Sequence, residues 1–302
     1  MHRLFPHVVY TADAITRNEL SNKTVVTEPV YMATLMSRVR DLWHLIGGKC
    51  RAYAQVVDPK TEQYYGIDVV VHLHSPDGHK LLALEAKRPT FPEPRGKWDY
   101  VTKGTQSHFS QQLDRQIAHI DPSVVFGGLF LDARPHYAPV AGFDPLGSLF
   151  CDSQALKNHE NAFMAKRTTH PYWTNADVAS LVAANPLSGA TPPLGHVLNL
   201  QELLQKIMDC GQGGRINARN FPKILTAMAR ARAAATRREG QRPPSDKDVA
   251  AQIAYAFGCA QVLTLEIDWF KGDGADVARL RQWNLSQRKA TPGSRTKARR
   301  RS

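Results

Sequence analysis

Two carboxylates and one amine, Asp68, Glu85 and Lys87, carry the clearest chemistry in this sequence. Paired carboxylates offer the hard oxygen ligands that Mg²⁺ and Mn²⁺ prefer, and the carbonyl of the intervening Ala86 adds another oxygen. A bound divalent ion lowers the pKa of a water and polarises a phosphoryl oxygen. A neighbouring amine positions or helps to deprotonate that water and stabilises developing charge. If the chain brings these residues together, they predict metal-assisted phosphodiester cleavage.

A β-hairpin would bring them together. Two runs rich in Val, Leu and Ile cover residues 67–74 and 81–87, and the turn-forming residues SPDGH separate them. Side chains alternate between the faces of a strand, so Glu85 and Lys87 share one face. A turn that pairs Ser75 with Lys80 places Asp68 opposite Lys87 on that face. The alternative is an ordinary cross-strand ion pair on a solvated sheet face.

The segments Gly66-Ile67-Asp68 and Glu85-Ala86-Lys87-Arg88-Pro89 resemble the D…(D/E)xK core of the PD-(D/E)xK nuclease superfamily. The string EAKRP is similar to the nuclease domain of type I restriction enzyme motor subunits. The resemblance covers the chain from Thr27 to Asp132. It implies a metal-dependent DNA endonuclease, in a restriction or anti-phage defence setting, in which Asp68 and Glu85 bind Mg²⁺ or Mn²⁺ and Lys87 assists the water.

A helix is predicted over 28–46, where apolar residues recur at spacings of three and four and Thr27 and Pro29 are start signals. Glu28 stands at the head of the apolar stripe. In the family that the chain resembles, an acidic residue on the first helix commonly joins the metal site, and Glu28 is the matching position. The alternative is a carboxylate favoured by the helix macrodipole.

A second helix is predicted over 105–120, with Gln112 and Gln116 along one edge of its buried stripe. Several branches of the family carry a Gln on this helix, sometimes as Gln-xxx-Tyr, and this chain departs from that pattern. Gln112 is the candidate for a catalytic role, and an ordinary surface helix is the alternative for Gln111, Gln112 and Arg115. The predicted nucleic-acid contacts are Arg88, Gln111, Gln112, Arg115, Arg230, Arg237, Arg299, Arg300 and Arg301.

An apolar run over 124–131 predicts a central strand buried on both faces. The resulting order of elements matches the family's α/β fold, a restriction-endonuclease-like mixed sheet flanked by helices. Changes in composition suggest a nuclease-like domain over 1–150 and a mainly α-helical region over 151–285 that holds or selects DNA. In that region, 245–262 weakly resembles a helix-turn-helix, with Gly258 near its turn.

The charge of the chain favours a polyanionic partner. The formal net charge is +12, and residues 286–302 hold seven Lys and Arg residues and no acid. This basic tail is expected to be disordered and to raise the affinity for nucleic acid through counterion release, or else simply to solubilise the terminus. The four cysteines lack metal-ligand spacing. No apolar stretch suits a membrane span, so a cytoplasmic protein without a membrane partner is expected.

The function expected from the sequence is a metal-dependent DNA endonuclease, with Asp68, Glu85, Lys87, Glu28 and Gln112 in the active site. Two other classes stay open. One is a catalytically inactive nucleic-acid-binding protein on the same scaffold, and the other is a subunit whose basic surface meets an acidic protein. A homodimer is compatible with double-strand cutting. His72 and His74 share the inferred face of Asp68; cross-strand packing is the expected role of both, and support of the metal site or contact with substrate is the alternative.

Overall fold

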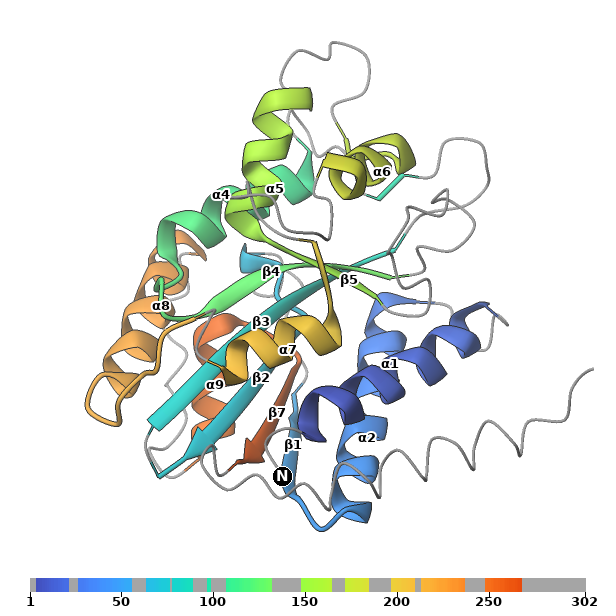
Figure 1. Cartoon of the computed structure of the whole chain (residues 1–302). Coiled ribbons are helices and arrows are strands. Elements are labelled where there is room, and N and C mark those ends of the chain that lie inside the picture. The colour runs from blue at the N-terminus through green and yellow to red at the C-terminus, as the bar shows by residue number, and fades with distance from the viewer. Residues whose placement is uncertain are drawn as a thin grey trace, which may run out of the picture.

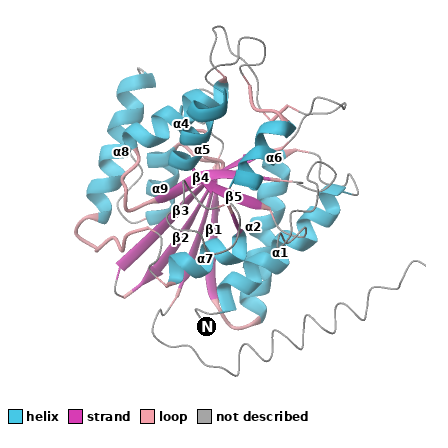
Figure 2. Cartoon of the chain, turned by 45° about the horizontal axis from the view of Figure 1, so that its top comes forward, coloured by secondary structure: helices cyan, strands magenta, loops and turns pink. Residues whose placement is uncertain are grey.

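The computed structural model describes residues 4–21, 27–55, 64–76, 78–88, 97–98, 107–131, 148–164, 172–184, 197–209, 213–236 and 248–267. These residues form one seven-stranded mixed sheet with helices on both faces (Figures 1 and 2). The strands are β1 (Lys49–Ala54), β2 (Val69–Ser75), β3 (Gly78–Lys87), β4 (Val125–Phe130), β5 (Leu149–Asp152), β6 (Leu198–Asn199) and β7 (Gln261–Glu266). Their order in the sheet is β1-β7-β2-β3-β4-β5-β6.

Helices precede and separate these strands in the described part of the chain. They are α1 (Phe5–Ser21), α2 (Glu28–Leu45), α4 (His108–His119), α5 (Ser153–His159), η2 (Glu160–Met164), α6 (Asn175–Ala184), α7 (Leu200–Met208), α8 (Phe221–Thr236) and α9 (Val249–Phe257). The α/β class, the mixed sheet and the helices on its faces agree with the sequence prediction. Within the described residues, no helix combines the length and the apolar character that crossing a membrane requires.

The predicted hairpin is present, but its register differs from the prediction. Ser75 pairs with Gly78 rather than with Lys80, and Val69 pairs with Leu84. Extending this register by one residue puts Asp68 opposite Glu85, not opposite Lys87. The predicted turn was two residues too long. A shift of two residues leaves every side chain on its predicted face, because the side-chain period of a strand is two.

Gly78 makes the short turn possible. Its φ of 139° lies in a region that favours glycine, and an added Cβ would stand 2.6 Å from the Ile216 carbonyl oxygen. That close approach holds residues 215–217 against β3, where His79 and Ile216 exchange two backbone hydrogen bonds of 2.8 and 2.9 Å. The end of the hairpin is therefore fixed to the segment that leads into α8.

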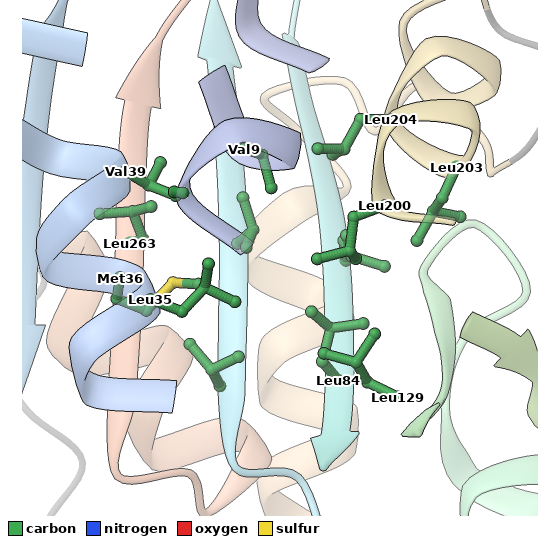
Figure 3. Close-up of a cluster of buried hydrophobic side chains, with 14 of the residues drawn as sticks. Val9, Leu35, Met36, Val39, Leu84, Leu129, Leu200, Leu203, Leu204 and Leu263 are labelled. Atoms are coloured by element: carbon green, nitrogen blue, oxygen red, sulfur yellow. The ribbon is translucent and has the colours of Figure 1, made fainter. Parts of the chain in front are cut away.

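Helices α1, α2 and α7 cover one face of the sheet. Val69, Val71 and Leu73 of β2 point to this side and join Leu82 and Leu84 of β3 in its core. Figure 3 shows apolar side chains from the three helices meeting those of the strands. Burying each such side chain contributes about 1.5–3 kcal/mol, so this layer fixes the position of α2 on the sheet.

Helices α8 and α9 cover the opposite face near β2 and β3, where Val70, Leu81 and Ala83 point. Helices α4, α5 and α6 pack around Phe130, Leu149 and neighbouring aromatic residues at the β4–β5 side. The charged residues Glu85 and Lys87 belong to this second face by alternation with Leu84 and Ala86. They therefore point toward α4.

The C-terminal part of the chain differs from its prediction. After α9, Gly258 adopts a left-handed conformation with φ 67°, and the chain enters β7 instead of a second helix. No helix-turn-helix forms there. Strand β7 runs parallel to β2 and antiparallel to β1. The boundary predicted at residue 150 lies inside β5, and strands from both sides of it share the sheet.

Candidate active site

The predicted acidic residues meet where β2 begins and β3 ends. The Asp68 amide donates to the Leu84 carbonyl (2.9 Å), and the Asp68 Oδ2 atom accepts from the Ala86 amide (2.6 Å). Residues 84 and 86 thus both direct their backbone groups toward β2. The N–H and C=O of one residue in a strand point to the same side, so the Ala86 carbonyl faces the edge that Asp68 occupies.

Glu85 and Lys87 form a buried ion pair on the α4 side of the sheet. The Lys87 Nζ atom lies 2.5 Å from the Glu85 Oε1 atom, and their side chains are 12% and 1% exposed. The ammonium also lies 4.8 Å from the centre of the Phe109 ring and 3.5 Å from the Gln112 Oε1 atom. The two groups therefore form a close charged pair beneath α4. Gln112, a candidate site residue, thus lies beside Lys87.

Gln116 holds the second oxygen of Glu85, a role that the sequence analysis did not assign. Its Nε2 atom donates to Glu85 Oε2 (2.9 Å) and to the Tyr65 carbonyl (2.7 Å), and its Oε1 atom accepts from the Ser153 hydroxyl. Gln116 is fully buried. Its spacing of four residues from Gln112 on one helix face was the available signal.

Gly66 gives these side chains room. Its φ is +71°, and an added Cβ would lie 2.2 Å from the Gln112 Nε2 atom and 2.8 Å from the Glu85 Oε1 atom. Both the backbone conformation and the close approach therefore require glycine. The glycine two residues before Asp68 shapes the site as well as the turn into β2.

Glu28 reaches the site from the first turn of α2. Thr27 caps this helix by accepting from the Val30 amide (3.4 Å). The Glu28 Oε1 atom accepts from the Arg88 amide (2.6 Å), which ties the helix to the residue that follows β3. Glu28 is half-buried. The structure thus brings Glu28 to the same end of the hairpin as Asp68 and Lys87.

The pKa of the Asp68 carboxyl is raised well above its ordinary value. Burial is the main cause and the negative charge of Glu28 is the second, whereas Lys87 and the Ala86 amide oppose the shift. The pKa of His108 moves the other way: burial, and then the positive charges of Lys87 and Arg115, lower it to about 4. An additional positive charge placed among the carboxylates would therefore stabilise their ionised forms.

The other residues predicted to contact nucleic acid lie in several parts of the chain. Arg88 and Gln111 are half-buried, and Arg115 donates to the Tyr64 carbonyl (3.2 Å) while lying over the Tyr64 ring. Arg230 is exposed on α8. Arg237, Arg299, Arg300 and Arg301 lie outside the described residues. The structure therefore places Arg88, Gln111 and Arg115 on the elements around the carboxylates.

Side chains alone supply only part of the ligand set that a divalent ion needs at this site. Among the described residues, no three His, Cys, Asp or Glu side chains are placed to hold one ion together. Magnesium commonly uses one or two carboxylates and completes its octahedron with water and substrate oxygens. Asp68, Glu85 and the Ala86 carbonyl supply oxygen atoms of the kinds that this smaller requirement uses, and burial followed by the charge of Glu28 raises the pKa of Asp68.

The chain matches no known family model, and neither the curated proteins nor the solved structures contain a match to it.

Proposed function

We propose that the protein is a metal-dependent DNA endonuclease that hydrolyses phosphodiester bonds. The observation that carries this proposal is the convergence of Asp68, Glu85 and Lys87 at one end of the hairpin, with Ala86 N–H on Asp68 and Lys87 on Glu85. Burying two carboxylates side by side costs stability, and such a cost is common where a site serves chemistry. The order of elements and the mixed sheet support a restriction-endonuclease-like fold.

Each residue has a distinct role in this proposal. Asp68, Glu85 and the Ala86 carbonyl would hold the divalent ion, and Glu28 adds negative charge beside them. When bound, the ion would supply Lewis acidity and lower the pKa of water next to the phosphate. The Lys87 ammonium orients the attacking water and stabilises charge that develops on the phosphoryl oxygens. Gln116 keeps the Glu85 carboxylate in place, while Gln112 does the same for Lys87.

The charge of the chain supports DNA as the substrate. A formal net charge of +12 favours association with a polyanion. Arg88 and Arg115 lie on the elements that surround the carboxylates, where they can contact the phosphates that flank the cleaved bond. Cutting both strands of a duplex takes two active centres, which a homodimer supplies. The proposed setting is restriction or defence against phage.

Plasmid cleavage tests the proposal directly. Purified protein is incubated with supercoiled plasmid and Mg²⁺ or Mn²⁺, beside Asp68→Ala and Lys87→Ala. Nicked or linear product is expected from the wild type only. Asp41→Ala is the matched control, because Asp41 is an exposed acid paired with its neighbour Arg40 on α2. Equal cleavage by the wild type and both site variants would refute the assignment.

A catalytically inactive nucleic-acid-binding protein is the second candidate. The observation that favours it is the lack of a three-residue ligand group within the described part of the chain. Titration calorimetry with Mn²⁺ separates the candidates. Heat of binding that disappears in Asp68→Ala supports the nuclease, whereas DNA binding without any Mn²⁺ heat supports the inactive module.

A further inference from the structure

The far end of the β2–β3 hairpin carries a stack of aromatic rings. The centroid of the His79 ring lies 4.0 Å from that of Phe221 and 4.9 Å from that of His74, with interplanar angles of 16° and 19°. Phe221 is buried, His79 is half-buried and His74 is exposed. The three rings therefore form a near-parallel column whose exposure increases from the protein interior to His74.

A buried partner fixes the middle of this column. The His72 Nε2 atom lies 2.9 Å from the His79 Nδ1 atom, and the His72 Nδ1 atom lies 3.3 Å from the Thr264 hydroxyl. His72 is 2% exposed. Hydrogen bonds on both sides of the His72 ring hold the imidazole of His79 at a set angle, so the column has a fixed orientation.

Two exposed arginines, Arg215 and Arg219, lie in the segment that joins this end of the hairpin to α8. Arg215 packs beside the hairpin turn, with its Cγ atom 3.3 Å from the position of a Cβ on Gly78. Arg219 lies two residues before Phe221, and both arginines are exposed. The acid opposite His74 in the register, Glu266, lies 3.8 Å from Lys49 as an ion pair. The exposed His74 ring and two exposed arginines thus belong to the same end of the hairpin.

This combination suits a nucleic acid with unpaired bases. A base offers a flat π face for stacking, and its phosphates offer anions to nearby arginines. A duplex hides its base faces, whereas a single strand, a flap or a bulge exposes them. An acidic protein would use the arginines but would have no special use for the exposed imidazole ring.

We propose that His74 is a stacking platform for an unpaired base, and that Arg215 and Arg219 bind the phosphates on either side of it. The platform lies six residues along β2 from Asp68, or about 20 Å at 3.3 Å per residue. This inference rests on the nucleic-acid binding in the proposed function, but it does not require cleavage. It assigns single-stranded segments to the substrate class.

The test measures fluorescence anisotropy of labelled oligonucleotides with the full chain in EDTA, so that cleavage cannot occur. One probe is a 20-nucleotide thymidine strand, and the other is an abasic strand of equal length with the same phosphates. His74→Ala is expected to raise Kd about tenfold for the thymidine strand, within the range for one stacked base, and to leave the abasic strand unchanged. His74→Phe should restore the wild-type affinity.

Two further variants complete the design. Arg215→Gln with Arg219→Gln should weaken binding of both strands, because phosphates are common to them. His44→Ala, which removes an exposed histidine from α2, should change neither. The proposal is overturned if His74→Ala binds the thymidine strand as tightly as the wild type does, or if it loses the same affinity for both strands. It is also overturned if the wild type binds neither strand. Binding without plasmid cleavage would refute the nuclease and leave the platform standing.

Discussion

The two ends of the β2–β3 hairpin both hold buried titratable side chains on one face of the sheet, but they balance charge in opposite ways. At the Asp68 end, burial and Glu28 raise the pKa of a carboxyl that Lys87 only partly compensates. At the histidine end, burial lowers the pKa of His72 to about 3 and that of His79 to about 4. Neutral imidazoles that bond to each other need no further partner, whereas clustered carboxylates call for a cation.

Substitution of Asp68 is expected to have the largest effect on cleavage. It also tests whether the Asp68 end of the hairpin lowers the stability of the fold. Asp68→Asn should lower plasmid cleavage by about a thousandfold or more, as losing a principal electrostatic group does. Because the folded-state pKa is raised, the ionised carboxylate costs stability above the unfolded pKa. The same variant should therefore raise the free energy of unfolding at pH 7 by about 1 kcal/mol.

Urea denaturation measures this gain, and it should shrink as the pH falls toward 4. If Asp68→Asn were inactive but less stable than the wild type at pH 7, the buried Asp68 carboxylate would not destabilise the fold. The contrast with the neutral histidines at the other end of the hairpin would then be wrong.

Lowering the pH should destabilise the protein through the histidine end of the hairpin. The folded-state pKa values of His72 and His79 are lowered from the ordinary 6.5 to about 3 and about 4, so protonation favours the unfolded chain. Stability is then unaffected above pH 6.5 and is lost as the pH falls below it. At pH 4.5, two units below the ordinary pKa, His72 alone should cost roughly 2–3 kcal/mol, and the half-buried His79 should add less because solvent screens its charge.

Urea unfolding at pH 7 and pH 4.5 checks this loss. The double variant His72→Phe/His79→Phe keeps the rings and removes the titration, so its stability should fall less between the two pH values. An equal fall in both proteins would show that other groups carry the acid sensitivity.

The two glutamines of α4 give the smallest effect and the finest comparison. Gln116→Ala should weaken Mn²⁺ binding about 10- to 100-fold, because Gln116 fixes a proposed ligand through a 2.9 Å hydrogen bond. Gln112→Ala should weaken it less, since Gln112 contacts Lys87 at 3.5 Å and no proposed ligand. Calorimetry measures both, with circular dichroism as the check of folding. The reverse order would show that Lys87, rather than Glu85, controls the affinity for the ion.

Local pattern was enough to predict the hairpin, α2, α4, β4 and the shared face of Asp68, Glu85 and Lys87. Alternation survives an error of two residues in turn length, and amphipathic spacing is a strong signal for helices such as α2. A place for Glu28 near the hairpin, by contrast, was expected only through the family resemblance, and its hydrogen bond from the Arg88 amide was not expected, since no local rule joins residues 60 positions apart.

Other features were missed because long-range packing creates them. The six-residue strand β7 lies between β1 and β2, far from both in sequence. The predicted helix-turn-helix failed for the same reason: a neighbouring strand on each side outweighed any local preference after Gly258. Gln116 looked like one more polar residue on a helix until the fold placed it against Glu85 and Ser153.

The central place of β7 delays completion of the sheet until residues 261–266 have been synthesised. Strand β2 has β7 as its neighbour on one side, and β1 is joined to the sheet through β7 alone within the described residues. A ribosome-bound chain that has not yet released residues 261–266 cannot close this gap. The end of β2 that presents Asp68 therefore gains its neighbour on this side only after residues 261–266 have left the ribosome.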